Sequence, residues 1–393
     1  MSDALSIRRQ RQLVLSGTGP CPESFDAIII EILSWLPVKS LLRFRCVCKA
    51  WRALISQSYF IKKHLIRTEI NASFKLLVKE SFVFRSIEYQ ALFNCLSDDG
   101  TIPHRELDFP EINLPMFEFL YMRIIGACNG LICLLLDCET STIMLWNPCT
   151  RDSQVLPQPP IIHRDLRFFG FGYDSTTDDY KVVLGCWNSS YESVIVFTLK
   201  TGSWRKLQSL TKYFRVLSIG RIVNEALHWL LYEPFEQPMF CPSRIVSFDL
   251  AEEKFHEIAF PYPPNPIDRC TLVADVETLG NCLTLYFQTM DCRAGCEMKI
   301  WVMKEYGVKE SWAEVINIPS GILGERYSFM RCISENGEVL MRLGSVGPLA
   351  IYNPKEKTFR ILLHHNHEAF YDTATYVETL VSPFIGSSIG TSM

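Results

Sequence analysis

Long apolar runs and CxxC pairs are missing from these 393 residues, and we expect no secretory leader. The longest apolar runs, such as Leu131–Leu136, are far too short to cross a bilayer, and no long apolar stretch follows the basic N-terminus. No CxxC pair occurs, and the fifteen cysteines are odd in number and scattered. This usage favours reduced thiols inside a cell, in the cytoplasm or the nucleus, over a disulfide framework or a zinc site.

The common catalytic motifs are also absent: there is no GxSxG elbow, no Walker loop and no HExxH helix. Phe169–Tyr173 begins like a GxGxxG loop, but Ser175 occupies the last glycine position and no helical pattern follows. Carboxylate pairs such as Asp98-Asp99 and Glu252-Glu253 lie in turn-like segments, and turn chemistry explains them better than acid–base work. A histidine-rich segment at 364–367 has no evident further metal ligand. We therefore expect no catalytic residue, metal or cofactor.

Acidic residues are absent between Ile32 and Thr68, although the same stretch holds eight Lys and Arg residues. This stretch carries +8 while the whole chain carries −4, so the remainder carries −12. Such an asymmetry predicts that the N-terminal part is a separate unit with its own partner, either an acidic protein surface or nucleic acid. The negative net charge of the chain argues against a globally basic nucleic-acid binder.

The pattern inside the basic segment is helical. Apolar residues recur at steps of three and four from Ile28 to Leu36, and Pro37 ends this run because proline cannot continue a helix. Further short helical segments follow as far as Leu65. A piece of about forty residues buries too little surface to be stable alone, so we expect it to depend on a partner or on the rest of the chain.

From about residue 74 onward the helical period gives way to short β-rich runs separated by turn signals. One element recurs, namely a strand with an aromatic residue, a polar turn and another aromatic or apolar residue. The recurring aromatics are Trp146, Phe197, Phe248, Trp301 and Tyr352, at spacings of 51, 51, 53 and 51 residues. One more step back reaches Cys95, where a degenerate sixth copy fits. A period near fifty with about four strands per copy is typical of a kelch-type propeller, with each aromatic between neighbouring blades. In a closed ring, a strand within Thr375–Leu380 is a candidate to complete the first blade.

The run from Ile30 to Arg52 resembles the F-box, through Leu-Pro-Val-Lys-Ser-Leu-Leu at 36–42, Val-Cys-Lys at 47–49 and the tryptophan at 51. It is most similar to the F-box of large plant families that couple this motif to a C-terminal F-box-associated, kelch-like domain. The family usually opens with a Leu-Pro pair, and this chain has Ser24-Phe25 there instead.

The resemblance implies a multidomain protein. We expect a flexible tail over 1–20, an all-α F-box of three to four short helices over 21–66, and a flexible tail over 385–393. Between them, an all-β propeller of six kelch-like blades of about 51 residues should span 70–382.

The resemblance also implies a non-catalytic adaptor. The F-box would dock on the Skp1 subunit of an SCF-type (Skp1–cullin–F-box) E3 ubiquitin ligase, and through it on cullin. The propeller would bind a target protein for ubiquitination and proteasomal degradation. The expected Skp1 contacts are Phe25, Ile29, Ile32, Leu36, Pro37, Leu41, Val47, Cys48 and Trp51. For Leu41 and Trp51 the alternative is a place in the core of the helical unit.

Two other functions stay open at this point. One is a propeller hydrolase or lyase with a basic helical appendage, which needs polar groups converging in the central channel. The other is a nucleic-acid-binding helical unit that uses Lys39–Arg67 on phosphates. The long F-box match favours the adaptor, with neither a membrane nor nucleic acid as partner. The sequence assigns no target-binding residue.

Overall fold

The chain divides into two units between Ile70 and Asn71. The computed structural model describes residues 25–70, 74–80, 83–94, 102–110, 122–137, 141–160, 166–187, 192–207, 219–232, 242–260, 270–291, 295–319, 328–334, 336–344, 347–362 and 371–384. The expected tails at 1–20 and 385–393, Cys95 and the histidine-rich segment at 364–367 lie outside these residues.

The first unit is helical and consists, within the described residues, of α2 (Phe25–Leu33), α3 (Val38–Phe44), α4 (Lys49–Ile55) and α5 (Ser58–Ile70). Pro37 stands at the N-cap of α3 in an extended conformation, so it separates α2 from α3. Cys48 caps α4 because its sulfur accepts a hydrogen bond from the backbone N–H of Trp51 at 3.4 Å.

The core of this unit is small and apolar. Its buried apolar side chains are Leu33, Val38, Leu41, Ile55 and Phe60, drawn from all four helices. With so few residues inside, each one accounts for a large part of the apolar surface that the unit removes from water.

The second unit contains the described strands, which form six four-stranded sheets with antiparallel neighbours. The first sheet consists, in spatial order, of β24 (Tyr371–Val377), β1 (Phe74–Glu80), β2 (Val83–Glu88) and β3 (His104–Leu107). The second consists of β4 (Met122–Cys128), β5 (Leu131–Asp137), β6 (Ser141–Trp146) and β7 (Ser153–Val155). The third consists of β8 (Leu166–Asp174), β9 (Asp179–Trp187), β10 (Glu192–Thr198) and β11 (Ser203–Lys206).

The other three sheets have the same order. The fourth consists of β12 (Arg221–Val223), β13 (Ala226–Tyr232), β14 (Pro242–Asp249) and β15 (Phe255–Ile258). The fifth consists of β16 (Cys270–Leu279), β17 (Cys282–Asp291), β18 (Gly295–Met303) and β19 (Trp312–Ile318). The sixth consists of β20 (Ser328–Ile333), β21 (Val339–Leu343), β22 (Leu349–Asn353) and β23 (Thr358–Ile361). Among the described residues, two short helical segments are added, α6 (Tyr89–Asn94) after β2 and η3 (Lys309–Ser311) before β19.

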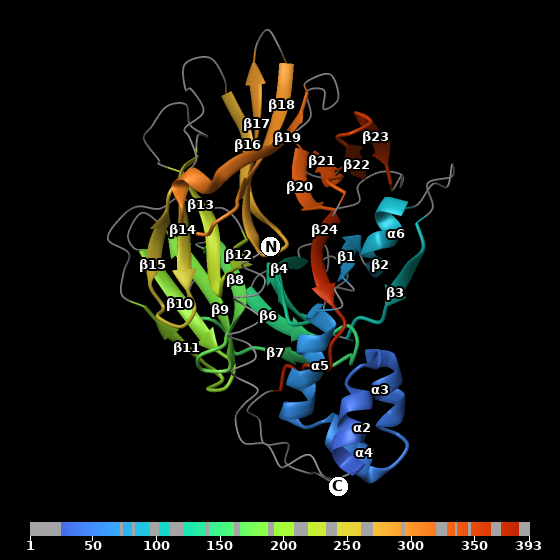
Figure 1. Cartoon of the computed structure of the whole chain (residues 1–393). Coiled ribbons are helices and arrows are strands. Elements are labelled where there is room, and N and C mark those ends of the chain that lie inside the picture. The colour runs from blue at the N-terminus through green and yellow to red at the C-terminus, as the bar shows by residue number, and fades with distance from the viewer. Residues whose placement is uncertain are drawn as a thin grey trace. The chain divides into compact units, whose positions relative to one another are not determined.

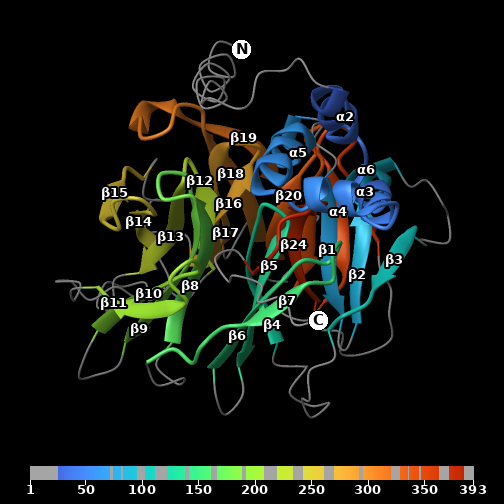
Figure 2. The same cartoon turned by 90° about the horizontal axis from the view of Figure 1, so that it is seen from below.

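The six sheets form a ring, with β24, β4, β8, β12, β16 and β20 as the inner strands (Figures 1 and 2). The ring is closed by β24, which pairs with β1 from Phe74 opposite Val377 to Glu80 opposite Tyr371. The closing strand overlaps the expected Thr375–Leu380 but begins four residues earlier. Apolar contacts between the first and sixth sheets, such as Leu76 with Ile351, complete the closure. This confirms the expected fold of short helices followed by a six-bladed propeller.

A polar turn after the third strand of several blades gives the repeat its regularity. Asn147, Asp249 and Asn353 each accept hydrogen bonds with Oδ1 from the backbone N–H groups two and three residues later. Four residues after each of them stands a residue with positive φ, for example Glu253 at 57°. Because the Asx side chain fixes the turn, the third and fourth strands meet in the same register in these blades.

The expected repeat-core aromatics lie at or near the ends of the third strands, and four of the five are fully buried: Trp146, Phe197, Phe248 and Tyr352. Phe197 packs on Trp204 with ring centroids 5.1 Å apart, and Phe248 packs on Phe255 at 4.8 Å.

In the fifth blade Trp301 is half-buried, and Met303 instead pairs with the first residue of the fourth strand, Trp312. The turn containing η3 and a bulge at Trp301 shift the register there. Trp301 nevertheless packs against the apolar cluster between the fourth and fifth blades, which contains Met303 and Trp312.

Candidate protein-binding surface

Large apolar side chains stand exposed along one side of α2. Ile28 and Ile32 are one helical turn apart, and each keeps 59% of its surface accessible. Trp35, in the turn after α2, is 54% exposed, and Val47, just before α4, is 64% exposed. Exposed apolar side chains of this size are the usual mark of an interaction site, because water contact with them is unfavourable.

An ion cluster fixes this side of α2 against α5. The Nζ of Lys63 lies 2.6 Å from Oε2 of Glu31, and Arg67 pairs with the same carboxylate. Arg67 also donates to the backbone carbonyl of Glu31 at 2.8 Å, and its guanidinium lies 4.4 Å from the ring centroid of Trp35. The hydrogen bond from Lys63 lowers the pKa of Glu31, and Arg67 lowers it further despite the opposing effect of desolvation. The cluster holds Trp35 in place while leaving much of its ring accessible.

A buried histidine connects α5 to the end of α2. The Nε2 of His64 donates to the backbone carbonyl of Leu36 at 2.9 Å. Burial lowers the pKa of His64 below its ordinary value, although the bond to Leu36 opposes this. The ring is therefore neutral at physiological pH and satisfies a carbonyl that the helix end leaves without an intrahelical donor.

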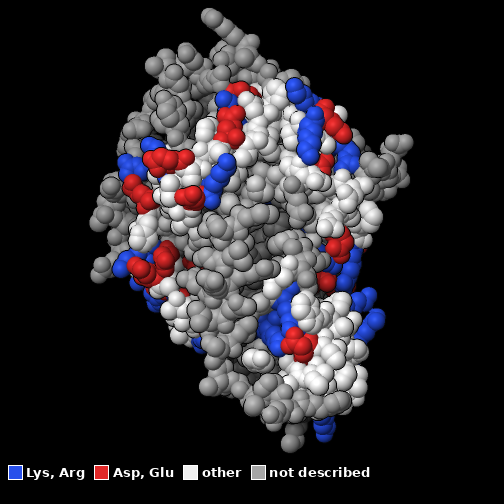
Figure 3. All heavy atoms as spheres, viewed as in Figure 1, with Lys and Arg blue, Asp and Glu red and all other residues white. Residues whose placement is uncertain are grey.

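The helical unit also exposes several basic side chains, on α3 and α4. Lys39, Arg43, Lys49 and Arg52 are exposed. On the face seen in Figure 3 the helical unit shows more blue than red, whereas the propeller shows both colours. The unit therefore exposes both large apolar side chains and an excess of positive charge.

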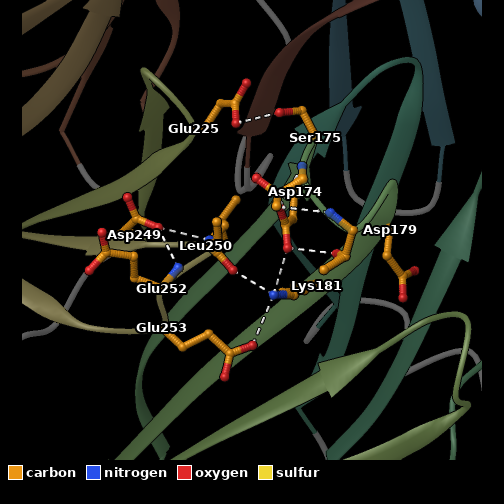
Figure 4. A network of polar contacts seen from close by, with 12 residues as sticks. Asp174, Ser175, Asp179, Lys181, Glu225, Asp249, Leu250, Glu252 and Glu253 are labelled. Atoms are coloured by element: carbon orange, nitrogen blue, oxygen red, sulfur yellow. Dashed lines mark hydrogen bonds and ion pairs between the residues drawn. The ribbon is translucent and has the colours of Figure 1, made fainter. Parts of the chain in front are cut away.

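In the propeller, a buried lysine connects the third and fourth blades (Figure 4). The Nζ of Lys181 lies 2.8 Å from Asp174 and 2.9 Å from Glu253, and donates to the carbonyl of Leu250 at 2.5 Å. Burial opposes the charge on Asp174, but Lys181 and Thr177 outweigh it, and the pKa of Asp174 lies below its usual value. Carboxylates neutralised in this way hold two blades together and are poor proton acceptors.

Charged residues also converge on the inner strands, where the sequence analysis predicted no polar cluster. Arg221 on β12 forms an ion pair with Glu277 on β16, and Asp275, Arg331 and Asp372 contribute to the same electrostatic field. Burial raises the pKa of Glu277 to about 7, although Arg221 opposes this. One sequence feature could have predicted this cluster, namely single charged residues within apolar β-rich runs. In Val273–Glu277, for example, two charged residues at alternate positions share one strand face.

The described residues form neither a metal-binding cluster nor a membrane-spanning helix. No group of three or more His, Cys, Asp or Glu in that part of the chain is arranged to hold a metal ion. None of the described helices combines the length and the apolar character that crossing a bilayer demands.

Comparison with known families matches both units. Residues 86–382 match the family described as the F-box associated beta propeller domain, and residues 25–63 match the F-box domain. The chain belongs to the F-box-associated propeller family. This confirms the expected plant F-box protein with a C-terminal propeller domain.

Curated relatives align with most of the length of this F-box protein. An F-box/kelch-repeat protein of Arabidopsis thaliana is 27% identical over 90% of this chain and 94% of its own. The F-box protein CPR1 of Arabidopsis thaliana is 28% identical over 90% of this chain and 87% of its own. Among solved structures, TolB from Acinetobacter baumannii covers 82% of this chain and 73% of its own at 10% identity, with a TM-score of 0.43, too distant to carry an argument.

The F-box residues assigned to Skp1 contact occupy three kinds of position. Leu41 is fully buried in the core of the F-box. The partly buried members are Ile29, Leu36 and Trp51, and the exposed members are Ile32, Pro37, Val47 and Cys48. Phe25 begins α2, but its side chain lies outside what the structure describes.

The F-box exposes two residues that the sequence analysis did not single out, Ile28 and Trp35. Their signal was the spacing of four and three residues from Ile32, which places all three on one side of a helix and its following turn. Trp51 is partly covered by Phe44, whose ring centroid lies 5.3 Å from its own, so it belongs partly to the core.

Proposed function

We propose that this F-box protein is the substrate-recognition subunit of an SCF-type E3 ubiquitin ligase. Its F-box docks on a Skp1-like protein and through it on cullin, and its propeller holds a target protein for ubiquitination and degradation. The observation that carries the proposal is the exposed stripe of Ile28, Ile32 and Trp35, in a unit whose core is already filled by other residues.

The composition of this surface is typical of a protein-binding site. An apolar centre with a charged border is the usual anatomy of a stable protein interface, and aromatic and aliphatic anchors supply most of its binding energy. The exposed basic side chains of the unit would attract an acidic partner and raise the association rate; they include Lys39, Arg43, Lys49 and Arg52.

The propeller's part in this function is to bring a target close to the transferred ubiquitin, so no catalytic group of its own is needed. The described carboxylates Asp174 and Glu253 are ion-paired to Lys181, and this network joins two blades. We place the protein in the cytoplasm or nucleus, where free thiols such as Cys133 and Cys186 remain reduced.

The test is binding of the full chain to a purified Skp1-like protein, measured by calorimetry. An Ile28→Glu/Ile32→Glu double variant should weaken binding by about 30-fold or more, because it places two charges in the centre of the interface. Val315→Glu is the matched control, since Val315 is 45% exposed on β19 of the propeller. Its affinity should stay unchanged.

Two results would contradict the proposal. Full binding by the double variant would show that the α2 stripe is not the docking surface. Absence of binding by the wild type, together with salt-dependent binding of an unrelated oligonucleotide, would favour the nucleic-acid function instead.

A further inference from the structure

The inner strands bring opposite charges together at the axis of the ring. Arg221, Asp275, Arg331 and Asp372 come from β12, β16, β20 and β24, and each is only partly covered. The pKa of Asp275 is raised by its burial and lowered in part by Arg221 and Arg331, which places these charges within one electrostatic environment. A propeller axis is a channel in general, and here it is lined by ionisable groups.

Most of these axial charges have partners of their own. Arg221 is paired with Glu277. Asp275 accepts a hydrogen bond from the backbone N–H of Val276 at 2.9 Å, and Asp372 accepts one from Ile124 at 2.6 Å. The axial carboxylates are therefore compensated by contacts that the fold already provides.

Arg331 is different. Its Nε is buried without a hydrogen-bond partner, and its guanidinium makes no hydrogen bond or ion pair with any residue that the structure describes. It is the extra residue of a β-bulge, because Met330 pairs with Met341 and Cys332 with Leu340, which leaves Arg331 without a partner across the ladder. Bulges redirect side chains and occur often beside functional sites.

The surroundings of Arg331 hold charges of both signs. Its positive charge acts on the carboxylates of Asp275 and Glu277, but it forms no ion pair with either of them. Burial lowers the pKa of Arg342 on β21 to about 10, and the positive charge of Arg331 lowers it further. Arg221, beyond its ion pair with Glu277, also has an Nε that is buried and has no hydrogen-bond partner. A buried guanidinium Nε without a hydrogen-bond partner is unfavourable even where carboxylates lie within electrostatic range, so such a group calls for a ligand.

We propose that the axis of the propeller binds an oxyanion, a phosphate or carboxylate group, with Arg331 as its main ligand and Arg221 beside it. The planar guanidinium fork matches both anions and forms short charge-assisted bonds to either. The oxyanion is either a free small molecule or an acidic group at the end of a target segment. The site lies in the propeller and does not depend on how the F-box acts.

The experiment is thermal unfolding of the full chain in sodium phosphate, pyrophosphate, acetate and chloride at equal ionic strength. A bound oxyanion should raise the melting temperature of the propeller in proportion to the logarithm of its concentration, whereas chloride should not. Stabilisation by free phosphate or pyrophosphate points to a small-molecule ligand. Stabilisation by acetate alone points to a carboxylate, as a protein segment would supply.

The variants test the assigned residue. Arg331→Met should abolish the oxyanion effect while the propeller stays folded in chloride, because it removes a guanidinium that makes no hydrogen bond or ion pair with a described residue and keeps the apolar stem. Arg331→Lys should keep the charge but weaken the oxyanion effect by about tenfold in affinity, since the fork is lost. Arg244→Met is the matched control, an arginine on β14 whose side chain is 39% exposed and paired with Glu257. It should respond to oxyanions like the wild type.

The proposal fails if none of the oxyanions stabilises the wild type more than chloride does, or if Arg331→Met keeps the full effect. It also fails if Arg331→Met lowers the melting temperature in chloride while Arg331→Lys restores it with no response to oxyanions. That pattern would show that Arg331 is paired within the protein itself.

Discussion

Leu41 and Ile32 were both assigned to Skp1 contact from the sequence, and the structure predicts opposite consequences for their loss. Leu41 is fully buried, whereas Ile32 is 59% exposed. Leu41→Ala should unfold the F-box, and Ile32→Ala should leave it folded and act only on binding. The two variants together separate a core residue from an interface residue.

The magnitude follows from the size of the unit. Truncating a fully buried leucine to alanine costs about 2–5 kcal/mol. The F-box spans the 46 residues from Phe25 to Ile70, and at about 0.05–0.15 kcal/mol per residue its stability is about 2–7 kcal/mol. Leu41→Ala should therefore remove most of the free energy of unfolding of the F-box. Ile32→Ala, at an exposed position, should change stability by less than about 0.5 kcal/mol.

Hydrogen exchange of the full chain measures this directly. In Leu41→Ala the amides of α2 to α5 should lose protection while those of the propeller strands keep theirs. Excess Skp1-like protein should restore the protection, because a ligand of the folded state draws the equilibrium toward it. Ile32→Ala should show normal protection and weaker binding. Normal protection in Leu41→Ala combined with lost binding would refute the reasoning and make Leu41 a contact residue.

Three predictions concern the propeller. Lys181→Met should destabilise it by about 3–5 kcal/mol, because two carboxylates lose their buried counter-charge; an unchanged melting temperature would contradict this. Burial lowers the pKa of His228 from 6.5 to about 4, so folding stability should fall as pH drops from 6.5 toward 4. His228→Gln should lose less folding stability than the wild type between pH 6.5 and 4, as measured by acid titrations followed by fluorescence. Equal slopes of stability against pH in the two proteins would refute the assignment. Gly130→Ala should destabilise more than Gly202→Ala in urea unfolding, since both have positive φ but only at Gly130 would a Cβ lie 2.3 Å from Thr379 Oγ1. Equal losses would show that the turn adapts.

The F-box helices could be predicted from the sequence because their signals are local. The three- and four-residue apolar spacing and Pro37 act within one or two turns and locate the helices. Their ends are less well predicted, since α2 ends at Leu33 and α5 continues to Ile70. The blade count followed from the repeat period for a related reason, since each copy repeats the same strand and turn chemistry. The charge asymmetry between the two parts of the chain could also be predicted, because it depends only on the numbers of charged residues in the sequence.

The tertiary structure decided what depends on distant partners. Which isoleucines of α2 face outward depends on how α5 packs, through the contacts of Lys63 and Arg67 with Glu31. The closing strand begins at Tyr371 because it pairs with β1, nearly the whole length of the propeller away in sequence. The place of Arg331 at the axis depends on a bulge and on ring closure, neither of which leaves a local signal. Apolar periodicity specifies elements, whereas register and convergence are set by hydrogen bonds and packing between segments that only the folded chain brings together.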